Sequence, residues 1–291
     1  MKALVYHGPG KMKFDNMPKP ALQAGTDAIV RMSKTTICGT DLHILKGDLS
    51  TVSEGRILGH EGIGVIEEAG SGVSRFHKGD RVMISCITSC GRCEYCRRGM
   101  PSHCEQGGWI LGNTIDGTQA EFVRIPHADV SLYAIPEGAD DDSMVMLSDI
   151  LPTGYECGVL NGCVKPGDTV ALVGAGPVGL SALLTTQFYA PARIIVIDLD
   201  DNRLAVARQF GATDVINSTD GKTVEKVMAL TSGRGVDVAI EAVGVPPTFS
   251  IWQEIVGAGG HLSNIVVHGK SVILRMEELW SKNVTITTRL V

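Results

Sequence analysis

The sequence has no run of Lys and Arg residues, and acidic side chains outnumber basic ones. Its 291 residues include 26 Lys and Arg against 32 Asp and Glu, which gives a net charge of −6 and a pI near 5.8. A protein that binds nucleic acid or anionic lipid presents a basic patch, so neither partner is expected. With 44% hydrophobic and 20% charged residues, the chain is predicted to be globular and to act on small molecules.

Neither an export signal nor a membrane-spanning segment is expected from this sequence. Residues 1–9 contain no apolar run long enough for the core of a signal peptide. Residues 169–192 carry no charge over 24 positions. However, three glycines and a proline between positions 174 and 179 divide this stretch into a strand, a turn and a helix. We therefore expect a cytoplasmic protein without a membrane segment.

Eight cysteines in a chain of this length do not form a disulfide framework, and four of them crowd into 15 residues. These four are Cys90, Cys93, Cys96 and Cys104. Four thiolates close a tetrahedral zinc shell with no open position, so this spacing predicts a structural zinc site. Chance burial or disulfide pairing is the alternative. The cysteines without an evident metal partner are interpreted as small apolar residues: Cys86, Cys157 and Cys163.

The pattern of predicted secondary structure changes near residue 150. Before it, short β-type runs at 28–32, 64–68, 81–85 and 120–125 are separated by Gly and Pro, which predicts a compact, barrel-like β domain. After it, apolar strands largely alternate with amphipathic helices, the pattern of a doubly wound parallel sheet. Six strands are expected, at 169–173, 194–197, 214–216, 236–240, 261–266 and 284–288.

A glycine motif follows the first strand of the second half. Gly174-Ala-Gly176-Pro177-Val178-Gly179 lies between that strand and a helix-like segment at 180–189, which is the context that dinucleotide binding requires. The first glycine allows a tight turn, the second lets the backbone approach a pyrophosphate, and the third permits close helix–strand packing. The helix N-terminus then offers free N–H groups to the phosphates.

The next strand ends at Asp198, 19 residues after the last glycine. A carboxylate there accepts hydrogen bonds from the adenosine ribose and repels a 2′-phosphate, so NAD is favoured over NADP. The positive charge of Arg203 weakens this preference for NAD over NADP. A glycine-rich turn followed by a surface aspartate is the structural alternative.

A catalytic zinc needs three protein ligands and an open position, and the candidates Cys38 and His60 lie far apart in the sequence. Either residue alone is more often part of a packed core. The motifs together, however, resemble a family. The chain is similar over its whole length to the zinc-dependent alcohol dehydrogenases of the medium-chain dehydrogenase/reductase superfamily. Four features carry this resemblance, in the family's order and spacing: Cys-Gly-Thr-Asp-Leu-His at 38–43, Gly-His-Glu at 59–61, the four-cysteine lobe and the glycine motif.

The resemblance implies an α/β protein with a GroES-like β-barrel catalytic domain over residues 1–150. It also implies a Rossmann domain, a doubly wound parallel six-stranded sheet, over residues 151–291. Two zinc ions per chain, NAD and a homodimer or homotetramer are implied as well. Cys38 and His60 would bind the catalytic zinc with Asp149, a carboxylate where many relatives have Cys and a feature shared with bacterial secondary-alcohol dehydrogenases.

The resemblance also implies the roles of neighbouring residues. Glu61 would approach the zinc during ligand exchange, and Asp41 would orient His60. Thr40 would take the alcohol proton and pass it through the nicotinamide ribose to His43 and solvent. In the second domain, residues 174–179 would hold the pyrophosphate, Arg203 would contact the adenosine ribose, and residues 242–244 and 265–267 would pass close to the nicotinamide.

The implied reaction is reversible hydride transfer between a small primary or secondary alcohol and NAD. Threonine and polyol dehydrogenases share the motif at 38–43 and are the nearest alternatives, although Trp109, Ile110 and Leu111 favour a small uncharged alcohol. A catalytically impaired protein that binds zinc and cofactor is another alternative. The family's chain returns to the catalytic domain after the sixth strand, whereas this sequence ends at Val291. We therefore expect NAD and zinc binding, with poor turnover by this chain alone.

Overall fold

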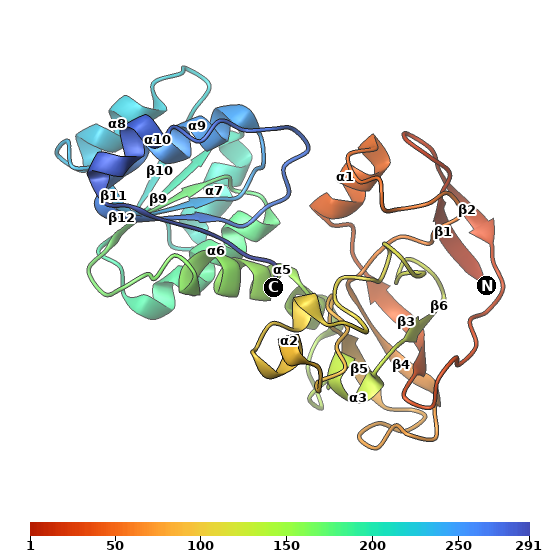
Figure 1. Ribbon diagram of the computed structural model, residues 1–291. Helices are drawn as coiled ribbons and strands as arrows, with labels where there is room; N and C mark the ends of the chain where they lie inside the picture. Colours follow the sequence, from red (N-terminus) through yellow and green to blue (C-terminus); the bar gives the residue numbers. More distant parts are fainter. The chain divides into compact units, whose positions relative to one another are not determined.

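The computed structural model describes residues 1–291, which divide into two compact units, Met1–Asp149 and Ile150–Val291 (Figure 1). The first unit contains an antiparallel five-stranded sheet in the order β6-β3-β4-β5-β7. Its strands are β3 (Ala28–Thr35), β4 (Gly62–Ala69), β5 (Arg81–Ile84), β6 (Phe122–Ile125) and β7 (Leu132–Ala134). A separate antiparallel pair joins β1 (Lys2–Tyr6) to β2 (Met12–Asn16).

The first unit has apolar clusters on both sides of this sheet, because alternate strand residues point to opposite faces: Ile63 and Met83 lie on one side and the larger core on the other. Val30, Ile66, Val82 and Val123 pack together there and are at most 1% exposed. The helices are short and lie between strands. They are α1 (Gly39–Lys46), α2 (Glu94–Arg97), η1 (Pro101–His103), α3 (Ala128–Ser131), α4 (Asp141–Met144) and η2 (Val145–Leu147).

The second unit is built on a parallel six-stranded sheet in the order β10-β9-β8-β11-β12-β13. Its strands are β8 (Thr169–Val173), β9 (Arg193–Asp198), β10 (Asp214–Asn217), β11 (Val236–Glu241), β12 (Val256–Asn264) and β13 (Thr285–Thr288). The strand order reverses between β8 and β11. In such sheets ligands bind beyond the carboxyl ends of the strands at this point of reversal.

Helices cover both faces of this sheet (Figure 1). Val170 and Leu172 of β8 pack towards one face, with α6 (Pro177–Thr186), α7 (Asp201–Gln209) and the π-helix η3 (Thr153–Leu160). Ala171 and Val173 pack towards the other, with α8 (Thr223–Leu230), α9 (Pro246–Ile255) and α10 (Met276–Leu279). The remaining short helices are α5 (Ile150–Pro152), η4 (Gln187–Tyr189) and η5 (Trp280–Lys282).

The predicted fold class is confirmed, and the differences from the predicted elements lie at element boundaries. The fifth strand of the sheet begins at Val256 rather than at residue 261, because its first half is glycine-rich and reads as a turn although Val256 pairs with Val236. The uncharged stretch 169–192 forms β8, a turn and the ten-residue helix α6. No helix in the chain has the length and apolar character needed to cross a bilayer.

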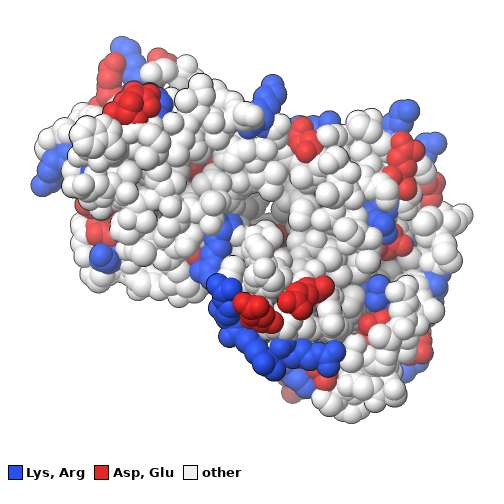
Figure 2. Space-filling view, in the orientation of Figure 1, with Lys and Arg blue, Asp and Glu red and all other residues white.

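Acidic and basic side chains are interspersed on the visible surface, with a small basic group over the lobe that carries α2 (Figure 2). Arg92, Arg97 and Arg98 are exposed there. Glu94 lies among them and pairs with Arg98 at 3.4 Å. The basic group is therefore small and partly neutralised.

Candidate functional site

Cys38, His60, Glu61 and Asp149 come together in the first unit. Cys38 precedes the first residue of α1, while His60 and Glu61 directly precede β4. Each residue offers one ligand atom, and the four atoms all lie within 4.8 Å of one another. A sulfur, an imidazole nitrogen and carboxylate oxygens form a donor set suited to zinc.

The electrostatics of this cluster also fit a cation. Glu61 is 1% exposed; one carboxylate oxygen accepts from the Thr36 hydroxyl at 2.7 Å, and the other has no hydrogen-bond partner. Burial and the nearby charge of Asp149 raise the pKa of Glu61. A buried acceptor without a donor is costly unless an ion or ligand satisfies it. The residues present therefore fit a divalent metal ion.

His60 lies at the centre of the cluster and is 3% exposed. Its Nε2 atom is 3.1 Å from Asp149 Oδ2 and 3.8 Å from Glu61 Oε1. Burial disfavours the charged imidazole, but the hydrogen bond to Asp149 and the Cys38 sulfur outweigh it, so the pKa of His60 is raised well above its usual range. A proton and a metal ion would therefore compete for the same nitrogen.

Asp41 bonds to the Cys38 segment in this structure, and the charge of the nearby His60 acts to lower the pKa of its carboxyl group. Its Oδ2 atom accepts from the backbone N–H of Cys38 at 2.9 Å and from the Gln119 side chain at 2.9 Å. Its other oxygen is buried without a hydrogen-bond partner. Asp41 thus fixes the backbone at Cys38, and burial raises its pKa.

Thr40 and His43 both lie on α1, three residues apart, and so share one face of the helix. The Thr40 hydroxyl is 3.8 Å from the sulfur of Cys38, which places it beside the cluster. His43 Nδ1 is 2.7 Å from Asp48 Oδ2, and the His43 side chain is partly exposed. The helix therefore leads from the cluster towards solvent.

Cys86 was interpreted from the sequence as an ordinary small apolar residue, but it lies beside the cluster. Its backbone N–H donates to the carbonyl of Ser148 at 3.1 Å. Burial, followed by the charge of Asp149, raises the pKa of the Cys86 thiol well above its usual range. Nothing in its local sequence distinguishes it from Cys157, a core residue of the second unit.

The four cysteines of the lobe form a second cluster, with their sulfurs all within 4.8 Å of one another. The backbone N–H of Cys93 donates to Cys90 Sγ at 3.4 Å, and that of Cys90 donates to Cys104 Sγ at 3.2 Å. A backbone N–H from Arg92 helps to lower the pKa of Cys90 to about 6, whereas burial and Cys93 raise that of Cys96 to about 12. Four sulfurs this close are all thiolates only when a cation neutralises them.

The glycine motif of the second unit has the backbone geometry expected of each glycine. Gly174 has φ +109°, in the left-handed region that favours glycine. A Cβ atom at Gly176 would meet no atom within 4 Å, so the backbone faces open space at the start of α6. A Cβ atom at Gly179 would lie 2.0 Å from the Gly174 carbonyl oxygen, so helix and turn pack closely there.

Asp198, the last residue of β9, lies beside this motif. Its Oδ2 atom accepts from the backbone N–H of Ala175 at 2.7 Å, while Oδ1 accepts from the backbone N–H groups of Leu199 and Asp200. Arg203 on α7 places its guanidinium 3.9 Å from the same carboxylate. Asp198 therefore also supports the glycine turn, a role that sequence spacing did not indicate.

Sequence reasoning missed Glu241, the last residue of β11, which is fully buried. Its carboxylate accepts from the backbone N–H groups of Val243 and Gly244 and from the Thr248 hydroxyl, the last at 2.7 Å. These contacts fix the loop at residues 242–244, which packs against Gly174. Burial raises the pKa of Glu241.

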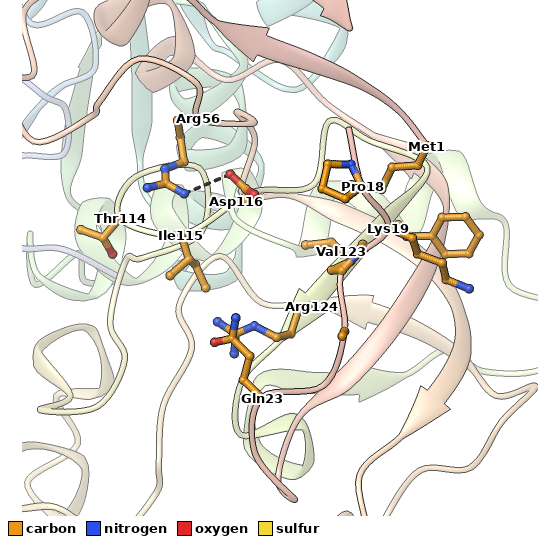
Figure 3. A pocket seen from close by; sticks show the side chains of 13 residues that line it. Met1, Pro18, Lys19, Gln23, Arg56, Thr114, Ile115, Asp116, Val123 and Arg124 are labelled. Atoms are coloured by element: carbon orange, nitrogen blue, oxygen red, sulfur yellow. Dashed lines mark hydrogen bonds and ion pairs between the residues drawn. The ribbon is translucent and has the colours of Figure 1, made fainter. Parts of the chain in front are cut away.

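A cavity of about 280 Å³ lies in the first unit (Figure 3), and no residue of either cysteine-containing cluster lines it. Its basic side chains are already paired: Arg56 with Asp116 at 3.0 Å, and Arg124 with Asp27 at 3.0 Å. Lys19 lies 3.1 Å from a Glu67 oxygen. None of the residues lining the cavity is a predicted ligand or catalytic residue.

Comparison with known families matches both halves of the chain. Residues 24–137 match the family described as "Alcohol dehydrogenase GroES-like domain", and residues 177–291 match "Zinc-binding dehydrogenase". An alcohol dehydrogenase of Cupriavidus necator is 38% identical, covering 94% of this chain and 78% of its own length. Zinc-type alcohol dehydrogenase B of Aspergillus flavus is 36% identical, covering 98% of this chain and 68% of its own length.

A solved structure shares the same backbone. The apo form of zinc dependent alcohol dehydrogenase 2 from Streptococcus pneumoniae is 56% identical, with a TM-score of 0.96. The match covers 100% of this chain and 83% of that one. At this level of identity and overlap, the two chains share their fold over all the residues described here.

Proposed function

The chain belongs to the zinc-dependent alcohol dehydrogenases of the medium-chain superfamily, and on that premise we propose that it catalyses NAD-linked oxidation of a small alcohol and the reverse reduction. The observation that supports this most strongly is the convergence of ligand atoms from Cys38, His60 and Asp149 within 4.8 Å. These three residues would hold a catalytic zinc, with Glu61 as a nearby carboxylate. The four-cysteine lobe would hold a second, structural zinc.

When bound, zinc supplies a Lewis acid that lowers the pKa of an alcohol towards neutrality, and NAD accepts the hydride. The residues of the chain then move the proton. Thr40, with its hydroxyl 3.8 Å from Cys38 Sγ, would accept the hydroxyl proton of the alcohol as it passes on its own hydroxyl proton. His43, one helical turn further and hydrogen-bonded to Asp48, would release the proton to solvent.

A small uncharged substrate is favoured by the apolar side chains on the Trp109 side of His60. The Trp109 ring meets the His60 ring edge-on, with centroids 6.2 Å apart. Trp109 itself packs against the apolar side chains of Tyr6, Ile44, Val52 and Leu58. An amino-acid substrate such as threonine would need charged partners for its ammonium and carboxylate groups. The apolar surroundings therefore support a short-chain primary or secondary alcohol.

NAD is proposed rather than NADP because Asp198 ends β9 beside the glycine motif. Gly174, Gly176 and Gly179, with Pro177 and Val178, would hold the pyrophosphate, while Asp198 and Arg203 would contact the ribose. The test compares kcat/KM for the two cofactors in the parent protein and in Asp198→Gly. We expect the parent to prefer NAD and the variant to narrow that preference. A parent protein that prefers NADP would contradict the assignment.

We also propose that the protein forms a homodimer or homotetramer. Strand β13 pairs only with β12 and so leaves one sheet edge open, while Ile273 and Trp280 in the same unit are 80% and 73% exposed. An open edge with exposed apolar side chains is suited to association. Light scattering of the purified chain tests this, and a monomer at micromolar concentration would contradict it.

The experiment that tests the activity combines metal analysis with turnover. We expect about two zinc equivalents per chain and oxidation of propan-2-ol with NAD that stops when a chelator removes the more labile equivalent. Threonine and a polyol serve as comparison substrates. Turnover that persists in chelator-treated, zinc-free protein would contradict the proposal. A higher kcat/KM with threonine or the polyol than with propan-2-ol would contradict the proposed substrate class.

A further inference from the structure

Two buried polar residues connect the three segments that carry the proposed zinc ligands. Neither is itself a ligand. Gln119 is 6% exposed and Ser148 is 3% exposed, and most of their side-chain hydrogen bonds are made with residues within three positions of a proposed ligand. The sequence did not single out either residue, because no local pattern marks them.

Gln119 connects the Cys38 segment to the His60 segment. Its backbone N–H donates to the carbonyl of Leu58 at 2.9 Å, two residues before His60. Its side-chain Nε2 donates to the carbonyl of Thr36 at 3.0 Å and to Asp41 Oδ2 at 2.9 Å, on either side of Cys38. A Cβ atom at Gly59 would lie 2.6 Å from Gln119 Cγ, so Gln119 packs against the His60 segment as closely as a glycine allows.

Ser148 connects the His60 segment to the Asp149 segment. Its hydroxyl accepts from the backbone N–H of Gly62 at 3.0 Å and donates to the carbonyl of Ile84, the last residue of β5. Its carbonyl accepts from the backbone N–H of Cys86 at 3.1 Å. Ser148 is therefore held by two adjacent strands, and Asp149 is the next residue along the chain.

These contacts decide how much order the ligands have before a metal ion binds. Without them, Cys38, His60 and Asp149 lie on separate loops, whose ordering free energy would be subtracted from the free energy of metal binding. With them, the ligand backbones are fixed by buried donors and acceptors that do not depend on the ion. Groups that orient ligands in this way are worth a large factor in metal affinity.

We propose that Gln119 and Ser148 are positioning residues that preassemble the zinc site at Cys38, His60 and Asp149. The proposal rests on the zinc site assigned under Proposed function. It predicts that removing either side chain lowers the affinity of this site for zinc about 10- to 100-fold, while the four-cysteine lobe keeps its zinc. The lobe thus serves as an internal reference in each protein.

The test uses the full chain in six forms: the parent, Gln119→Leu, Ser148→Ala, Ser148→Thr, and two matched controls in the second unit. Gln253 is 2% exposed and makes three hydrogen bonds, and Ser263 is fully buried and donates to the carbonyl of Cys157. Gln253→Leu and Ser263→Ala therefore remove equally buried polar groups far from any ligand in the sequence. Zinc affinity is measured by competition with a chelator, and thermal stability is recorded for each protein.

We expect both controls to lose thermal stability without a change in zinc affinity. Gln119→Leu and Ser148→Ala should bind the labile equivalent more weakly, and Ser148→Thr, which keeps the hydroxyl, should recover most of the affinity. If Gln119→Leu does not fold, the comparison of Ser148→Ala with Ser148→Thr tests the proposal by itself. Equal affinity in Ser148→Ala and the parent would overturn the positioning role. A parent that holds zinc only in the lobe would overturn the zinc site itself and this proposal with it.

Discussion

His60 Nε2 lies 3.1 Å from Asp149 Oδ2, although 89 residues separate the two in the sequence. Both atoms would donate electron pairs to the same metal ion, and they lie within hydrogen-bond distance of each other. The hydrogen bond to Asp149 raises the pKa of His60. Metal uptake at this site therefore releases a proton, and zinc affinity should fall as the pH is lowered.

The two zinc sites should be separable by substitution. Cys96→Ser removes one of four thiolates from a closed shell, so we expect the loss of about one zinc equivalent and a marked fall in Tm. Asp149→Ala removes a ligand from the open site, so turnover should be lost while most of the fold remains. Metal analysis and thermal unfolding of both variants check this. Identical metal loss and identical Tm in the two variants would contradict the existence of two sites.

Substitutions at Thr40 test the proposed path of the alcohol proton. Thr40→Ala should lose most of kcat, on the order of 10²–10⁴-fold, with zinc still bound, because it removes the hydroxyl that takes the proton. Thr40→Ser keeps the hydroxyl and should stay active. His43→Gln should have a milder effect, since solvent can replace the outer member of the path. Near-normal kcat in Thr40→Ala would remove this residue from the mechanism.

Two glycines of the same motif should respond differently to alanine. At Gly179 the new Cβ would lie 2.0 Å from a backbone oxygen, so Gly179→Ala should lower stability by about 1–3 kcal/mol or more. At Gly176 the Cβ meets nothing within 4 Å and φ is −74°, so Gly176→Ala should fold normally. It should nevertheless bind NAD more weakly, because the Cβ occupies the proposed approach of the pyrophosphate. Tm and NAD titration separate the two effects. Unchanged NAD affinity in Gly176→Ala would contradict the proposed pyrophosphate position.

Glu241 should make stability depend on pH. Burial raises its pKa above the ordinary value of 4.5, so folding favours the protonated form. Its contribution to stability is fully present below about pH 4.5 and is lost as the pH rises through the raised pKa. Glu241→Gln does not ionise, so the Tm of the variant relative to the parent should increase with pH across this window. A Tm difference that stays constant with pH would show that ionisation of Glu241 carries no penalty.

Features whose physics is local were predictable from the sequence. The turn at Gly174, the close packing at Gly179 and the four-cysteine lobe each depend on residues within about one loop of one another, and the structure has them at the expected positions. The alternation of apolar strands and helices likewise predicted the six-stranded sheet, because each strand must bury both faces. Only boundaries differed, as at the glycine-rich start of β12.

What the sequence by itself determined, then, is the fold class, the glycine turn and the cysteine lobe, since their spacing is fixed by a few consecutive bonds. Joining Cys38 to His60 required a resemblance, since no local rule brings residues 22 positions apart to one ion. Only the tertiary structure decided that Asp149 faces His60 and that Gln119 and Ser148 tie the ligand segments together. These residues lie outside the strands and far apart in the sequence, so their contacts depend on how the folded sheet brings the segments next to β4 and β5 together.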